Sequence, residues 1–130
     1  METKLFKIVV ADEFSKWPAG RYLSDSNASG ERFRNELLIP KLKELMEYNK
    51  ANENKERLYV DFNGVKMAGG SWLEEAFGGA VRESNIRPYD LFHLIEIIDH
   101  VSGNTISEKA HEYINDEIER CKGRESGGNS

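Results

Sequence analysis

Several kinds of residue and segment are scarce or missing in this 130-residue sequence, and each absence excludes a class of protein. The single cysteine, Cys121, excludes an internal disulfide framework and fits a reducing compartment. No hydrophobic run approaches the ~18 to 20 residues of a membrane-spanning helix, and the first residues contain no secretory hydrophobic region. The formal net charge of −5 argues against a nucleic-acid binder, which would need a basic surface. We therefore expect a cytoplasmic protein with no nucleic-acid and no membrane partner.

The composition is that of one small globular domain. Hydrophobic residues make up 38% of the chain and charged residues 32%, and a chain of this length can bury one core. We expect residues 1–122 to fold as that domain. Residues 123–130 are polar and rich in glycine, which predicts a disordered tail.

Hydrophobic patterns predict an alternation of strands and helices. Strands are expected at 5–10, 57–62 and 92–98, and helices are expected to begin near Glu31, at Ser71 and at Thr105. This order favours a small α/β fold, STAS-like in architecture, with a mixed but mostly parallel sheet. The polar segment 12–30 is expected to be a functional loop, although a fourth strand within 14–23 is left open. An uncovered sheet edge would let two chains pair, so a homodimer is also left open.

Two local signals refine the helices. Pro40 lies inside the first helical pattern and predicts a kink or a restart near Ile39. Ser71 with Glu74, and Thr105 with Glu108, have the spacing of a capping box, which predicts sharp helix starts at these two positions.

The most informative segment is 60–78, which reads as a buried strand, a glycine turn and a helix. The first N–H groups of the helix and the positive end of its dipole would face the turn. In α/β domains, ligands and partners usually bind at the strand ends where such turns lie. The turn is therefore the first candidate for a binding site.

The same turn has the spacing of a phosphate-binding loop, Gly64-x-x-x-x-Gly69-Gly70-Ser71. Gly70 stands where that motif has its lysine, which supplies the cation for the outer phosphates, so an NTPase is not expected. A tight turn with a helix cap explains the glycines better. A weaker alternative is a small phosphate-containing ligand or nucleotide, bound by the amides of Gly69, Gly70 and Ser71.

The remaining groups that often carry chemistry have simpler structural explanations. The three histidines are expected in a strand, at its exit and inside a helix, without the spacing of a metal site; they are His93, His100 and His111. Cys121 is expected on the buried face of the last helix. No set of hydrolytic groups gathers around Ser71, so we expect neither an enzyme nor a bound metal or cofactor.

The long loop contains one further pair of candidate residues. Arg21 has a planar guanidinium that suits carboxylate or phosphate groups, and Asp25 is close enough in sequence to hold it. The pair either clamps the loop to the body of the protein or binds a ligand, and the sequence leaves both open.

Two blocks of sequence resemble the STAS-like domain family of unknown function, whose members are similar to anti-sigma factor antagonists. The first block is PAGRYLSD at 18–25 with SGExFRxELLxP at 29–40, and the second is VDFxGV at 60–65 with SWLEEAFG at 71–78. The resemblance extends from about Lys4 to about Ile98. It implies the STAS fold.

The resemblance also implies a function. In STAS domains the turn after the strand carries an Asp-Ser pair, and a histidine-kinase-like ATPase phosphorylates the serine. Alignment with the family places that pair at Gly69 and Gly70, so this chain lacks the usual phosphoacceptor. The family implies a non-enzymatic regulatory module for a protein partner, such as an ATPase-type regulator, with an acidic contact face that would match a basic patch. The residues expected to contact the partner are Gly69, Gly70, Ser71, Glu74, Glu75 and Arg82.

Overall fold

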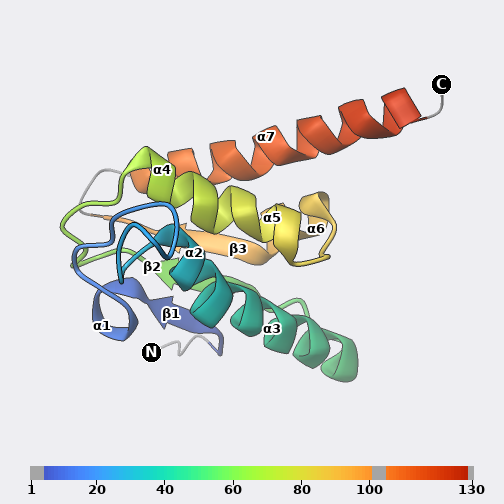
Figure 1. The fold of residues 1–130 in the computed structure, drawn as a ribbon. Helices are drawn as coiled ribbons and strands as arrows, with labels where there is room; N and C mark the ends of the chain where they lie inside the picture. The colour runs from blue at the N-terminus through green and yellow to red at the C-terminus, as the bar shows by residue number, and fades with distance from the viewer. Residues whose placement is uncertain (1–4, 101–104, 129–130) are drawn as a thin grey trace.

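A computed structural model describes residues 5–100 and 105–128 of the chain, and its centre is a three-stranded sheet (Figure 1). The strands are β1 (Lys7–Val9), β2 (Leu58–Asp61) and β3 (Ile95–Ile98), in the spatial order β1-β2-β3. Both neighbouring pairs are parallel, with Ile8 opposite Val60 and Val60 opposite Ile97. The predicted α/β class and the mostly parallel sheet are confirmed. The described residues add no antiparallel strand, and 14–23 contains no strand.

The helices connect the strands and follow the last one. They are α1 (Val10–Glu13), α2 (Gly30–Phe33), η1 (Arg34–Leu38), α3 (Ile39–Asn52), α4 (Gly70–Leu73), η2 (Glu74–Gly78), α5 (Gly79–Glu83), α6 (Pro88–Leu94) and α7 (Thr105–Gly128). The segments α2, η1 and α3 form one continuous helix, and α4, η2 and α5 form a second. Each continuous helix therefore contains one turn of π-helix, η1 or η2.

The π-turn of η2 keeps one set of buried residues in phase. Leu73, Phe77 and Val81 recur at intervals of four and all point into the core. An α-helix of ~3.6 residues per turn would rotate such residues gradually off one face. A wider π-turn corrects this drift. Pro40 lies just after η1, so the restart predicted near Ile39 coincides with the boundary between η1 and α3.

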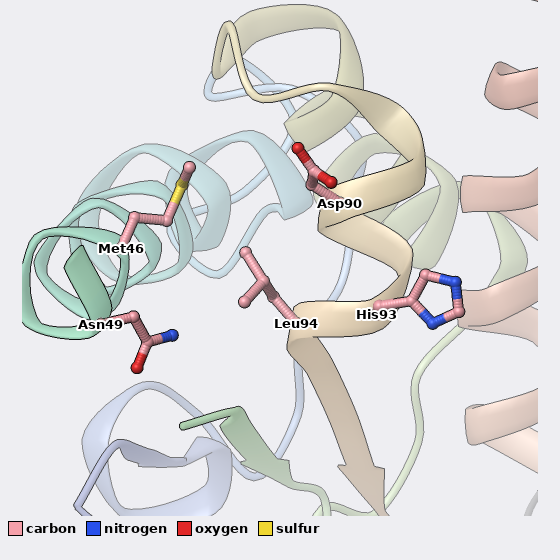
Figure 2. A pocket seen from close by; sticks show the side chains of 5 residues that line it. All are labelled: Met46, Asn49, Asp90, His93 and Leu94. Atoms are coloured by element: carbon pink, nitrogen blue, oxygen red, sulfur yellow. The ribbon is translucent and has the colours of Figure 1, made fainter. Parts of the chain in front are cut away.

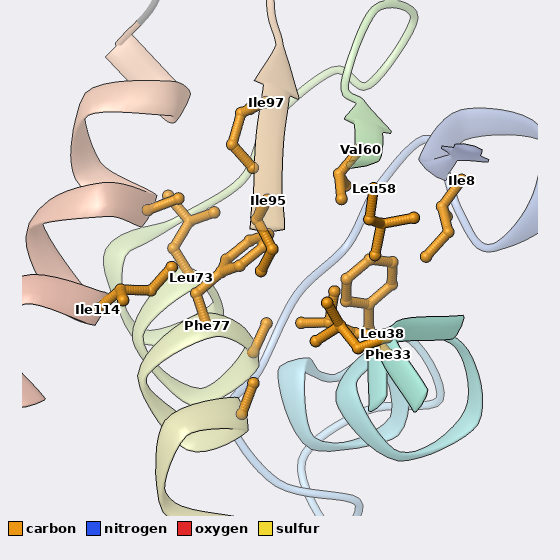
Figure 3. Packing of buried hydrophobic residues seen from close by; sticks show 14 of the residues in the cluster. Ile8, Phe33, Leu38, Leu58, Val60, Leu73, Phe77, Ile95, Ile97 and Ile114 are labelled. Carbon is orange, nitrogen blue, oxygen red and sulfur yellow. The ribbon is translucent and has the colours of Figure 1, made fainter. Parts of the chain in front are cut away.

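The core lies between one face of the sheet and the two continuous helices (Figure 3). Side chains from all three strands point to this layer, among them Ile8, Leu58, Val60, Ile95 and Ile97. The strand residues between them are only partly buried or exposed, so the sheet has one well-covered face. The two continuous helices are joined by aromatic contacts, the closest being Phe33 with Trp72, whose ring centroids are 5.0 Å apart.

The predicted start of the third strand is wrong. Residues 92–94, expected in the third strand, belong to α6, so His93 lies in a helix. Pro88 occupies the first turn of α6, where its fixed φ favours a helix start. A continuous apolar run is ambiguous between a strand and a buried helix, and here the proline decides for the helix.

The last helix, α7, begins beside the end of the sheet. The N–H of Ile106 donates to a carboxylate oxygen of Asp99 at 3.1 Å, so a residue that follows β3 caps α7. Thr105 is the first residue of α7, and residues 101–104 lie outside the described residues. The helix continues through 123–128, which belong to the segment expected as a tail. Residues 129–130 and the side chain of Cys121 lie outside the described part of the chain. Within 5–100 and 105–128, no helix has the length and hydrophobicity that a membrane crossing requires.

Candidate functional site

The turn between β2 and α4 lies at the edge of the sheet where the parallel strands end (Figure 1). It is bonded to the segments that follow both neighbouring strands. The N–H of Lys66 donates to the carbonyl oxygen of Lys16 at 2.7 Å, and the N–H of His100 donates to Asn63 Oδ1 at 2.9 Å. The turn is therefore held in one place by the chain that follows β1 and by the chain that follows β3.

The turn leaves three consecutive residues accessible. Gly69, Gly70 and Ser71 are all exposed. A Cβ added to Gly69 would meet no atom within 4 Å, whereas one added to Gly70 would lie 3.1 Å from Tyr113 Oη. The predicted binding turn is thus a solvent-accessible surface that the long loop does not cover.

The predicted capping box at this turn is wrong. The helix begins at Gly70 with Gly69 as its N-cap, and no side chain caps it. The Glu74 carboxylate instead accepts hydrogen bonds from Arg21 and Arg82, the latter at 2.7 Å. Two guanidinium groups outcompete a single backbone N–H, because hydrogen bonds between charged groups are the stronger ones.

Glu75 is not on the outward face of the helix, which corrects the sequence prediction. It is 7% exposed, and its carboxylate binds Arg34, which is 6% exposed and lies in η1 of the neighbouring helix. Arg21 Nη1 lies 3.2 Å from the same carboxylate and Arg82 Nη2 lies 3.7 Å from it. The wide turn of η2 directs Glu75 toward η1, so this side chain is withdrawn from any partner.

These groups form part of a larger ion-pair network, which we call the arginine cluster. Arg82 Nη1 donates to both Glu74 and Glu117 at 2.7 Å, and Glu117, which is 1% exposed, also binds Arg120 of its own helix. The cluster consists of Arg21, Arg34, Arg82, Arg120, Glu74, Glu75 and Glu117. Four guanidinium groups face three carboxylates, so the acidic face expected from the sequence is neutralised.

Arg21 ties the long loop to the body of the protein, but not through Asp25. Its guanidinium binds Glu74 and Glu75, 53 and 54 residues away in the chain. Asp25 Oδ2 instead accepts the backbone N–H groups of Arg21 at 3.2 Å and Tyr22 at 2.9 Å, which shapes the local turn. Of the two interpretations left open, the geometry favours the internal clamp, with Glu74 and Glu75 as its carboxylates.

A second contact fixes the same loop. Trp72 is 1% exposed, and its Nε1–H donates to the carbonyl oxygen of Ala28 at 2.8 Å. Ser29, at the end of the loop, caps α2 by accepting the N–H of Arg32 at 3.1 Å. The loop is therefore an ordered part of the site.

The cluster makes stability depend on pH through Glu74. Burial alone would raise the pKa of Glu74, but hydrogen bonds from Arg82 and Arg21 outweigh it and hold the pKa below its ordinary value. A lowered pKa stabilises the fold above the pKa of the unfolded chain, about 4.3, and this contribution is lost as the pH falls through the folded value. We expect Glu74→Gln to lower Tm by a few degrees at pH 7, and the difference from the parent to shrink toward pH 3.

Thermal melts of both proteins between pH 3 and pH 8 measure this difference. Glu44→Gln is the matched control, because Glu44 is exposed and its one ion pair in the described residues is with Lys41 at 3.8 Å. A Tm difference between Glu74→Gln and the parent that stays constant from pH 3 to pH 8 would show that the charge of the Glu74 carboxylate does not contribute to stability.

The histidines take separate structural positions. The ring centroid of His93 lies 4.5 Å from that of Tyr89, and His111 Nδ1 lies 2.9 Å from the carbonyl oxygen of Ser107. No group of three or more His, Cys, Asp or Glu residues that could hold a metal ion occurs in the described part of the chain.

A hollow of about 290 Å³ lies between α3 and α6, away from the turn (Figure 2). Its lining residues are Met46, Asn49, Asp90, His93 and Leu94. The Asn49 side chain already bonds both the N–H and the carbonyl oxygen of Glu56, and Asp90 is paired with Arg87. The hollow contains none of the predicted site residues, and its polar groups are largely engaged within the chain.

The fold and the position of the turn define a small STAS-like α/β domain, and comparison with known families agrees. A family model described as a STAS-like domain of unknown function (DUF4325) matches residues 29–100. The chain belongs to this family. No curated protein and no solved structure matches it.

Proposed function

We propose that this chain is a non-enzymatic regulatory module that binds a protein partner through the turn Gly69–Ser71. The observation that carries the proposal is the exposure of these three residues at the edge where the parallel strands end. Partners and ligands commonly bind at that edge, and glycine allows the backbone of another molecule to approach closely. The arginine cluster holds the helix behind the turn in place, so the surface is formed before binding.

The geometry narrows the surface that we assign to the partner. Glu75 is buried and cannot contact a partner. Glu74 and Arg82 are bonded to each other, so only the solvent-exposed parts of these two side chains can contact a partner. The proposed contact is therefore centred on Gly69, Gly70 and Ser71. The family resemblance supports a histidine-kinase-like ATPase regulator as the class of partner. Without the usual phosphoacceptor, binding would not be controlled by phosphorylation at the usual position.

The alternative function, a small phosphate-containing ligand at the same turn, has less support. That alternative relied on Arg21 as a cation beside the backbone amides. Arg21 is bound to Glu74 and Glu75, so its charge is already compensated within the chain. We therefore favour the protein partner.

Gly69→Trp tests the proposal, because it adds a large side chain where a Cβ meets no neighbouring atom. We expect the affinity for the partner to fall by about tenfold or more, equivalent to about 1.4 kcal/mol, while Tm stays within a few degrees of the parent. The partner is first captured with the parent chain, identified by mass spectrometry and purified. Isothermal titration calorimetry then gives the dissociation constant for each variant.

Lys43→Trp is the matched control. Lys43 is exposed on α3. This helix extends away from the turn (Figure 1), so the same large side chain there should leave the affinity unchanged. Equal affinities for Gly69→Trp and the parent would exclude the turn as the contact surface.

A further inference from the structure

The loop after β1 and the turn after β2 carry exposed hydrophobic side chains. Of the seven large hydrophobic residues that are exposed in the described part of the chain, four lie on the loop after β1 or on the turn after β2: Trp17, Tyr22, Leu23 and Met67. Trp17 and Met67 are each 65% exposed. The N–H of Lys66 donates to the carbonyl oxygen of Lys16, which brings together the segments that carry Met67 and Trp17. These segments are far apart in the sequence.

The segments that carry these two side chains are attached to the body of the protein. Pro18, next to Trp17, and Val65, two residues before Met67, are buried. The N–H of Trp17 donates to Ser15 Oγ at 2.9 Å, and the N–H of Val65 donates to the carbonyl oxygen of Phe62 at 3.0 Å. An exposed tryptophan on a fixed backbone loses little conformational freedom on binding, which favours affinity.

The charges next to the two side chains have the same sign. Lys16 directly precedes Trp17, and Lys66 directly precedes Met67; both lysines are exposed, and neither forms an ion pair with a described residue. The glutamates of the nearby helix, by contrast, are compensated by arginines. The charges that directly precede Trp17 and Met67 are therefore positive, opposite in sign to the acidic face expected from the sequence.

We propose that Lys16, Trp17, Lys66 and Met67, which we call the Trp17–Met67 patch, anchor the interface with the protein partner. The partner presents an apolar pocket for Trp17 and Met67, bordered by carboxylates that face the two lysines. This inference rests on the proposed function and specifies the chemistry of the partner. Tryptophan and methionine are enriched at protein interfaces, and tryptophan is prominent among the residues that contribute most to affinity.

A membrane surface is the other environment that suits tryptophan beside lysine. Two lysines would then have to draw a chain with a net charge of −5 to an anionic bilayer, and its overall charge opposes this. A carboxylate-bordered pocket on a protein requires only local complementarity, so the protein partner is favoured.

The experiment uses the partner purified as described above and isothermal titration calorimetry. We expect Trp17→Ala to weaken binding by about tenfold or more, and Met67→Ala to weaken it by a smaller factor. Lys16→Glu with Lys66→Glu should also weaken binding at low salt, and that difference should shrink at high salt because salt screens exposed charges. Tyr89→Ala is the matched control, because Tyr89 is 66% exposed on α6 and should bind like the parent.

The outcomes separate this inference from the proposed function. If Gly69→Trp abolishes binding while Trp17→Ala, Met67→Ala and the lysine variant bind like the parent, the patch is excluded and the turn remains. If every variant, including Gly69→Trp, binds like the parent, both are excluded. Capture of no partner would count against both. Co-sedimentation of the parent, but not of Trp17→Ala, with vesicles of equimolar phosphatidylcholine and phosphatidylglycerol would overturn the protein partner in favour of a membrane.

Discussion

Replacing Glu75 by alanine should lower the free energy of unfolding by about 3 to 5 kcal/mol, because it leaves a buried charge without its partner. Arg34 is 6% exposed, and among the described residues its one carboxylate contact is Glu75. Its other hydrogen bonds are to Asn35 Oδ1 at 3.0 Å and to the backbone carbonyl oxygen of Glu75 at 3.4 Å. A domain of this size is stable by only about 5 to 15 kcal/mol, so the variant should be severely weakened.

Urea unfolding at pH 7 measures this effect. Arg34→Met combined with Glu75→Leu should recover much of the stability that Glu75→Ala loses, because apolar side chains of similar volume replace a buried ion pair at little or no loss. Glu36→Ala is the matched control, because its pair with Arg32 is exposed and should contribute less than about 1 kcal/mol. A loss for Glu75→Ala as small as that of Glu36→Ala would mean that water reaches Arg34.

The second large effect is expected at Gly30, where the two continuous helices touch. A Cβ on Gly30 would lie 2.5 Å from the carbonyl oxygen of Trp72, 3.1 Å from the Cβ of Glu75 and 3.3 Å from the backbone N of Ala76. Two of these atoms belong to the backbone and cannot rotate away, so the helices must separate. We expect Gly30→Val to lower the free energy of unfolding by about 3 kcal/mol.

The same urea titration tests this expectation. Gly69→Ala is the matched control, because a Cβ there meets no atom within 4 Å and the change should be within about 0.5 kcal/mol. A Gly30→Val protein as stable as Gly69→Ala would show that the helices can move apart freely at this contact.

The order of the elements and the class of fold could be predicted from the sequence because each depends on local patterns. A short β-branched run marked β1, alternating residues marked β2, and an apolar stripe marked the helix after the glycine turn. The third strand was less certain, because residues 91–98 are apolar enough for either a strand or a helix. Pro88 begins α6, but no helix is expected there from the sequence.

The exposure of the glycine turn could be predicted from the sequence, but the ion pairs around it could not. Gly69–Ser71 is exposed, as the helix start after a turn suggests. A uniform α-helix would place Glu75 outward, whereas the π-turn at Glu74–Gly78 directs it toward η1. Arg34 lies buried four residues before Leu38, but charged residues are so seldom buried that its position is not expected from the sequence.

Contacts between segments that lie far apart in the sequence could not be predicted from it. Arg21 and Glu74 are 53 residues apart, and only the folded chain brings them together. The exposure of Trp17 and Met67 could not be read from the sequence either, since apolar residues in a loop are as often folded inward. Both features require the three-dimensional arrangement of the loop and the turn.

The π-turn of η2 has a consequence for how the length of this helix can vary. Each residue of an α-helix advances the direction of its side chain by about 100°. Deleting one residue from Glu74–Gly78 would convert the π-turn into ordinary α-helix, because a π-turn uses about one residue more for nearly the same rotation. Arg82 would then keep its direction toward Glu74 and Glu117, and Val81 would stay in the core. The π-turn is therefore where this helix can lose one residue and keep the following residues in phase, whereas a deletion from an α-helical turn would shift that phase by about 100°.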